Sequence, residues 1–261
     1  MDFTETRIIG MVHLDPLPGS PGFDRDRSAI REAAKTDART LAEGGVDAVL
    51  VENFGDAPYH PDSVPKHVVA ELTAVGRAVQ DEISIPLGLN VLRNDAEAAL
   101  SVASALEADF IRVNVHTGAR LTDQGLLAGS AHETLRLRDR LSTDIDIWAD
   151  VDVKHSTSLG DRVLEEQIDD LVSRGLADVV IVSGSKTGSP PSEETLARAQ
   201  QALGEHDGVP LVIGSGIRPD NAAALLEPAD GAIVGTAIKE GGDPSAPVSS
   251  RRVADLLSTA E

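Results

Sequence analysis

Short apolar runs alternate with longer amphipathic stretches along the whole chain. The amphipathic stretches have helical spacing, and they cover 28–43, 64–81, 94–106, 132–142, 160–174, 192–203, 220–226 and 248–258. The apolar runs have the length of buried strands, and they cover 8–13, 46–52, 85–91, 110–115, 145–153, 179–183, 210–214 and 231–235. Strands that alternate with helices are typical of a parallel sheet. Eight such units in 261 residues predict a single (β/α)8 TIM barrel over 1–261, with a doubly wound open sheet as the alternative.

Polar and apolar residues alternate within the fifth apolar run. Ala149 and Val151 lie on one predicted face, and Asp150 and Asp152 lie on the other. Successive side chains of a barrel strand point alternately to the helices and to the barrel interior, so we expect the charged face to point inward. The same rule, applied to the C-terminal ends of the first five strands, assigns to the interior His13, Glu52, Asn90, Arg112, Asn114, Asp150, Asp152 and Lys154.

These inward polar residues predict a functional site at the mouth of the barrel. A barrel interior is normally filled with Val, Ile and Leu, and buried charges destabilise a fold unless they are paired. The alternative is a paired structural network that fills the barrel. A long insert, 116–132, follows the fourth strand, so we expect the insert and its Asp123 to lie over the same mouth.

Glycine and small polar residues follow the last three predicted strands. Glycine lets a backbone approach an anion closely, and the loops after the seventh and eighth strands of a barrel commonly hold a phosphate. We therefore predict a phosphate site there, with tight turns as the alternative. The residues assigned to it are Ser183, Gly184, Ser185, Gly214, Ser215, Gly216, Gly235 and Thr236, with Lys186 as a possible source of positive charge.

The sequence requires no metal or cofactor. GxGxxG, P-loop, HExxH and GxSxG patterns are all missing, and without cysteine there is no thiolate ligand or cysteine nucleophile. Asp150 and Asp152 offer oxygen ligands for Mg²⁺, but Lys154 on the same predicted face would equally neutralise them. Lys154 also has the position of a Schiff-base lysine, although an ion pair is the favoured interpretation.

The charge balance restricts the partners. The chain has 43 acidic and 23 basic side chains, a formal net charge of -20. Such a field repels nucleic acid and anionic membranes. The acidic residues are scattered and the lysines few, which favours adaptation to high salt over an acidic interaction surface. The chain contains no membrane-length apolar run and no signal-peptide pattern, so we expect a cytoplasmic protein that binds a small molecule and forms a homo-oligomer.

Several long motifs resemble the BtpA/SgcQ family of TIM-barrel proteins. They are 13–21, 51–56, 88–95, 111–115, 122–125, 149–155 and 182–188. The chain departs mildly from the family at Asp15 and at 183–185, where Thr-Gly is expected. The resemblance implies the barrel. It also implies a choice of roles, because the family name comes from photosystem I accumulation, while other members are thought to act in nucleoside breakdown as phosphorylases.

Phosphate-dependent glycosyl transfer is the favoured function, for example phosphorolysis of a purine nucleoside such as guanosine to ribose 1-phosphate and free base. The glycine loops would hold inorganic phosphate as co-substrate. Glu52, Asp150 and Asp152 would stabilise the developing positive charge or bind ribose hydroxyls, and Asp123, Arg112 or Asn114 would assist the leaving base. The alternatives are a sugar-phosphate isomerase or aldolase that uses Lys154 or a carboxylate as base, and a non-catalytic assembly factor.

Overall fold

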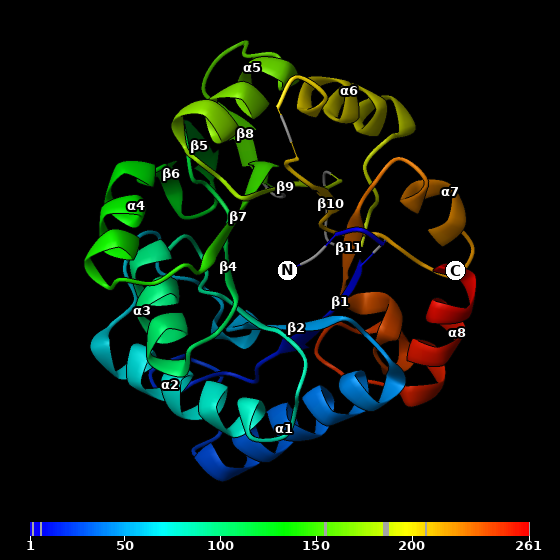
Figure 1. Ribbon diagram of the computed structural model, residues 1–261. Helices are drawn as coiled ribbons and strands as arrows, with labels where there is room; N and C mark the ends of the chain where they lie inside the picture. The colour runs from blue at the N-terminus through cyan, green and yellow to red at the C-terminus, as the bar shows by residue number, and fades with distance from the viewer. Residues whose placement is uncertain (2, 6, 154–155, 185–187, 207, 261) are drawn as a thin grey trace.

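Eight parallel strands close into a barrel whose outer side is covered by helices (Figure 1). The computed structural model describes residues 1, 3–5, 7–153, 156–184, 188–206 and 208–260. The predicted (β/α)8 TIM barrel is confirmed, and neighbouring strands follow the order β1-β11-β10-β9-β7-β4-β3-β2. The strands are β1 (Arg7–His13), β2 (Ala48–Glu52), β3 (Leu87–Asn90), β4 (Phe110–Val113), β7 (Asp146–Asp152), β9 (Val179–Val182), β10 (Leu211–Ile213) and β11 (Gly231–Val234).

The helices lie close to the predicted ranges, and local capping explains several of their ends. Asp26 accepts hydrogen bonds from the N–H groups of Ser28 and Ala29 at the start of the first helix, and Gly45 ends it with a φ of 94°. The helices are α1 (Arg27–Gly44), α2 (Lys66–Gln80), α3 (Ala96–Leu106), α4 (Ala131–Arg140), α5 (Leu164–Asp169), α6 (Glu193–Leu203), α7 (Ala222–Leu226) and α8 (Ser250–Ala260). Shorter helical turns are η1 (Phe54–Asp56), η2 (Asp170–Arg174), η3 (Thr236–Ile238) and η4 (Glu240–Gly242).

Side-chain alternation divides the apolar residues into an outer and an inner core. The outer core, between strands and helices, includes Val49, Val51 and Ile111, as the alternation predicts. The inner core fills the half of the barrel at the N-terminal ends of the strands, where the rings of Phe110 and Trp148 stack with centroids 4.0 Å apart. Because this end is filled, a cavity inside the barrel has room only at the C-terminal ends of the strands.

A bulge in β7 reverses the alternation at the end of the strand. Asp150 is paired with Ile181 of β9, whereas Asp152 is paired with the next residue, Val182. The extra residue in β7 turns Asp152 toward the outer side of the barrel, where its side chain is 58% exposed and forms an ion pair with Arg120. The prediction that Asp152 faces the interior is therefore wrong.

The insert after β4 forms a small antiparallel sheet. β5 (Ala119–Thr122) and β6 (Gly125–Ala128) make a hairpin, and β8 (Ser156–Ser158) pairs with the other edge of β5. The turn of the hairpin carries Asp123, which reaches the cavity described below. Within the described part of the chain, none of the helices has the length and apolar character needed to cross a bilayer.

Candidate functional site

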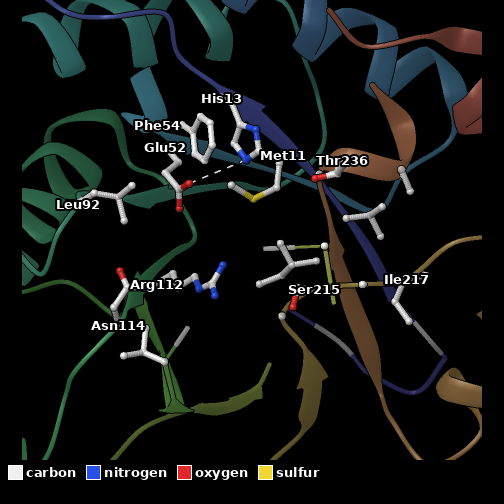
Figure 2. Close-up of a pocket in the computed structure, with 18 of the residues that line it drawn as sticks. Met11, His13, Glu52, Phe54, Leu92, Arg112, Asn114, Ser215, Ile217 and Thr236 are labelled. Atoms are coloured by element: carbon white, nitrogen blue, oxygen red, sulfur yellow. Dashed lines mark ion pairs between the residues drawn. The ribbon is translucent and has the colours of Figure 1, made fainter. Parts of the chain in front are cut away.

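A cavity of about 640 Å³ opens at the C-terminal end of the barrel. This volume lies within the range of small-molecule sites. Figure 2 shows side chains from several strands of the barrel converging on the cavity, with Glu52 on one side, Ser215 and Thr236 on the other, and His13 between Glu52 and Thr236. The sequence-predicted residues that line it are His13, Glu52, Arg112, Asn114, Asp123, Gly214, Ser215, Gly216, Gly235 and Thr236.

A buried ion pair forms the floor of the cavity. Arg112 donates from Nε and Nη2 to the two carboxylate oxygens of Asp150, both at 2.9 Å. Burial lowers the pKa of Arg112, but the charge and the hydrogen bonds of Asp150 outweigh it, so the pKa is raised above its usual value. Arg112 therefore remains a cation beneath the ligand space. Asp150 does not line the cavity, and it acts by holding Arg112.

Two asparagines connect this pair to the neighbouring strands. Asn90 donates from Nδ2 to the Arg112 carbonyl at 2.9 Å and to Asn114 Oδ1 at 3.1 Å. Asn114 in turn donates to Asp150 Oδ2 at 3.4 Å. Asn90 lies below the cavity surface, and its buried Oδ1 has no hydrogen-bond partner among the described residues. The network thus orients Arg112 and Asn114, the two members that reach the cavity.

A histidine–carboxylate pair forms one wall of the cavity. His13 Nε2 lies 3.8 Å from Glu52 Oε1, and the imidazole ring stacks on Phe54 with centroids 4.4 Å apart. The other ring nitrogen, Nδ1, is 2.8 Å from the carbonyl oxygen of Pro244. A carbonyl only accepts, so Nδ1 carries a proton. Nε2 is then the ring nitrogen of His13 that faces Glu52.

The glycine loops after β10 and β11 form the wall that continues from His13, because β11 is the direct neighbour of β1. At Gly214 a Cβ would lie 2.3 Å from Ser183 Oγ and 3.3 Å from Arg112 Nη2, so this backbone passes directly over the floor pair. At Gly235 a Cβ would lie 3.0 Å from His13 Cε1. The lack of side chains at Gly214 and Gly235 therefore brings the two loops against the cation and the imidazole.

The loop after β9 contributes less to the cavity than expected. Ser183 does not line it, and its Oγ donates to Asp150 Oδ1 at 3.4 Å. Gly184 packs against the backbone of Ser189 and Pro190 and also lies outside the lining. The expectation that Ser183 and Gly184 face the cavity is therefore wrong. The other sequence candidates in this region, Ser185, Lys186 and Lys154, lie outside the described residues.

The aromatic and charged lining residues that escaped the sequence interpretation are Phe54, Tyr59, Arg93, Arg218 and Arg252. Burial, reinforced by the charge of Glu52, raises the pKa of Tyr59 to about 12, so its hydroxyl stays neutral and donates to the Phe54 carbonyl at 2.8 Å. Phe54 lies in one of the quoted motifs, and its aromatic ring in a chain with 2% aromatic residues was a usable signal. Arg252 belongs to a helix, where strand alternation gives no information.

The lining is locally basic although the chain is acidic. Among the described lining residues four arginines face two carboxylates, those of Glu52 and Asp123. Arg112 and Arg218 are paired with Asp150 and Asp220 outside the lining, so the arginines favour an anionic ligand through their hydrogen-bond donors more than through net charge. The Asp150 and Asp152 carboxylates lie on opposite sides of the bulged β7 strand, so they do not form the Mg²⁺ site considered from the sequence. Among the described residues no three His, Asp or Glu side chains gather as metal ligands.

Comparison with known proteins gives consistent results over the whole length of the chain. The model of the BtpA family matches residues 4–261. An uncharacterized protein of Thermococcus kodakarensis is 50% identical over 261 residues, which are 100% of this chain and 97% of that protein. The photosystem I biogenesis protein BtpA of Synechocystis is 45% identical over 254 residues, which are 97% of this chain and 88% of that protein.

Solved structures resemble the chain in fold. Tryptophan synthase of Mycobacterium tuberculosis superimposes with a TM-score of 0.63 at 15% identity, covering 99% of this chain and 93% of that one. Thiamine phosphate pyrophosphorylase of Pyrococcus furiosus gives a TM-score of 0.59 at 15% identity, covering 99% and 96%. At this identity the likeness establishes the barrel, and the chemistry must be argued from the site itself.

Proposed function

This chain belongs to the BtpA family, and we propose that it is an enzyme that transfers a glycosyl group to inorganic phosphate. The specific reaction is phosphorolysis of a nucleoside, with a purine nucleoside such as guanosine as substrate and ribose 1-phosphate and free base as products. The family match supports the barrel but does not choose the reaction. The choice comes from the two unlike walls of the cavity.

The observation that carries the proposal is the presence of a carboxylate and an anion cradle on different strands around one cavity. Glu52 ends β2, whereas the glycine loops follow β10 and β11, and β1 with His13 lies between β2 and β11 in the barrel. Phosphorolysis needs a phosphate on one face of the sugar and negative charge near the ring, where positive charge develops as the glycosidic bond breaks. A cavity with both features supports this reaction over simple phosphate binding.

The chemical step balances with phosphate, these groups and one proton from solvent. A phosphate oxygen donates an electron pair to the anomeric carbon C1′ while the C1′–N bond breaks, and the electron pair of that bond leaves with the base. Phosphate on the glycine loops lies next to Arg112, whose charge holds the nucleophile in place. Glu52 accepts hydrogen bonds from the ribose hydroxyls and stabilises the oxocarbenium-like transition state. The leaving nitrogen takes a proton from solvent, while Asp123 accepts a hydrogen bond from the base and Asn114 donates one.

The aldolase alternative depends on one lysine. The candidate for its Schiff base is Lys154, which lies outside the described residues. A sugar-phosphate isomerase remains compatible with the same walls, because Glu52 or His13 could move a proton next to a carbonyl. The two reactions differ in their products, and this difference decides the experiment.

The test is incubation of the purified protein with single nucleosides, with and without inorganic phosphate. Base release is followed by liquid chromatography and ribose 1-phosphate by ³¹P NMR. We expect release that depends on phosphate, and a roughly 100-fold or larger loss of kcat for Glu52→Gln, since removal of one charge-stabilising group costs this much in other enzymes. Asp152→Asn is the matched control, because this carboxylate lies outside the cavity, and its rate should equal that of the wild type.

Three other results would contradict the proposal in different ways. Base release without phosphate would mean hydrolysis. Conversion of a ribose phosphate to its keto isomer, with nucleosides left intact, would establish the isomerase. A Glu52→Gln variant as active as the wild type would remove the assigned role of the carboxylate.

A further inference from the structure

We propose that Arg252 is a charged member of the phosphate site, and that its ligand is a phosphoryl dianion. This inference rests on the proposed function for the role of the bound phosphate in the reaction. It is tested by measuring phosphate binding, without turnover. Arg252 belongs to the first turn of α8, which packs beside η3 and between α7 and α1 (Figure 1). Its side chain lines the same cavity as Gly235 and Thr236.

The guanidinium of Arg252 is held by a hydrogen bond to the loop after β11 and lies beside the backbone of η4. Its Nε donates to the carbonyl oxygen of Ala237 at 2.8 Å, which ties it to the loop directly after β11. A Cβ at Gly242 would lie 3.7 Å from Nη2, an ordinary van der Waals distance, so the backbone of η4 borders the guanidinium. Because Nε donates to the Ala237 carbonyl, the N–H groups of Nη1 and Nη2 are the donors that a ligand can use.

Arg252 lacks the counterion that a half-buried cation needs. In a chain with 43 acidic side chains, no Asp or Glu of the described residues lies within ion-pair distance of Arg252. By contrast, Arg112 is paired with Asp150, and Arg218 at the same cavity is paired with Asp220 at 3.2 Å. Partly buried charges are normally paired. The structure therefore assigns the missing anion to the ligand.

The surroundings indicate phosphate as this anion. The N–H groups of Thr236 and Ala237 have no acceptor in the hydrogen bonds of the described residues, and both residues line the cavity with Arg252. Backbone N–H groups next to a guanidinium offer several donors to one ligand, which suits a group with three terminal oxygens. Free phosphate and the phosphoryl group of a sugar phosphate share this chemistry, and titration of each one separately distinguishes them.

The experiment is calorimetric titration of the protein with inorganic phosphate, ribose 5-phosphate and ribose at constant ionic strength. We expect Arg252→Met, which keeps an apolar stem, to bind the phosphorylated ligand at least 10-fold more weakly than the wild type. Arg252→Lys should recover part of the affinity. The control is Arg251→Met, because Arg251 is the adjacent residue on α8, is exposed and does not line the cavity, so its affinity should stay unchanged.

Each outcome of the titration has a definite meaning. Binding of inorganic phosphate identifies free phosphate as the ligand, and binding of ribose 5-phosphate alone identifies an ester. A folded Arg252→Met that binds like the wild type overturns the inference. An equal loss of affinity in Arg251→Met also overturns it, because such a loss would reflect only the long-range field. Failure of the wild type to bind either phosphate ligand overturns it as well.

Binding and turnover separate the two proposals. If Arg252-dependent phosphate binding occurs but no nucleoside is cleaved, the anion site stands and the phosphorylase proposal fails. If cleavage occurs with an unchanged KM for phosphate in Arg252→Met, the reaction stands and the role of Arg252 fails.

Discussion

Arg112 and Asp150 face each other across neighbouring strands, and the guanidinium uses two of its N–H groups to bind both carboxylate oxygens at 2.9 Å. Both side chains are almost completely removed from solvent, with 5% and 0% exposed. The pair also receives hydrogen bonds from Asn114 and Ser183. It is therefore the centre of the polar layer on which the cavity rests.

Loss of the Asp150 charge should destabilise the barrel strongly. Asp150→Asn leaves the Arg112 cation buried without a counterion, and we expect a loss of about 3–5 kcal/mol in the free energy of unfolding. Asp152→Asn is the matched control two residues away, and its exposed pair with Arg120 should contribute less than about 1 kcal/mol. Urea unfolding followed by circular dichroism measures both. Equal effects of the two substitutions would contradict the burial difference.

A second buried pair, Lys239 with Asp37, should hold the segment after β11 in place. Lys239 Nζ lies 2.6 Å from Asp37 Oδ2, and Asp37 Oδ1 accepts a hydrogen bond from the N–H of Val248. Lys239 is only 1% exposed. We expect Lys239→Met to lower the free energy of unfolding by about 3–5 kcal/mol, because Asp37 keeps its charge in a buried position.

The same denaturation assay supplies the controls for this pair. Lys35→Met, at a lysine paired with Glu32 and Glu82 on the surface, should have a much smaller effect. The double substitution Lys239→Met with Asp37→Asn should recover part of the lost stability, since it leaves no unpaired charge. If the double variant loses as much free energy of unfolding as Lys239→Met and Asp37→Asn lose together, the two side chains are not coupled.

The stability should fall in acid partly through His116. Burial lowers the pKa of His116 below its ordinary value of 6.5, and its Nε2 donates to the Gly175 carbonyl at 2.8 Å. The unfolded chain binds a proton as the pH drops through about 6.5, whereas the folded chain does not, so this contribution is complete above pH 6.5 and is lost below it. His116→Gln should reduce the decrease of Tm between pH 7.5 and pH 5. His132→Gln, at an exposed histidine, is the control and should leave the slope unchanged.

The net charge of -20 should make the stability depend on salt. Repulsion among the carboxylates weakens as the Debye length falls from about 10 Å at 0.1 M to about 3 Å at 1 M. We therefore expect Tm to rise as KCl is raised from 0.1 M to molar concentrations. Sucrose at equal osmolality is the control for effects of excluded solutes. A Tm that stays flat or falls over this range would contradict adaptation to high salt.

The sequence by itself determined the barrel and most of its polar mouth. Periodicities of strands and helices depend on local geometry, so eight alternating units were enough to predict the closed sheet. Alternation along each strand correctly brought Glu52, Arg112 and Asn114 to the cavity, because neighbouring side chains in a regular strand must point to opposite sides.

Only the tertiary structure decided where the local rules were interrupted and which distant segments met. The bulge in β7 turned Asp152 outward, and a single inserted residue of this kind leaves no clear periodic signal. The contact between His13 and Pro244 and the placement of Arg252 beside η3 join segments that the chain folds together from far apart. Such contacts depend on how helices pack around the closed barrel, and this packing is not encoded in the spacing of residues within one element.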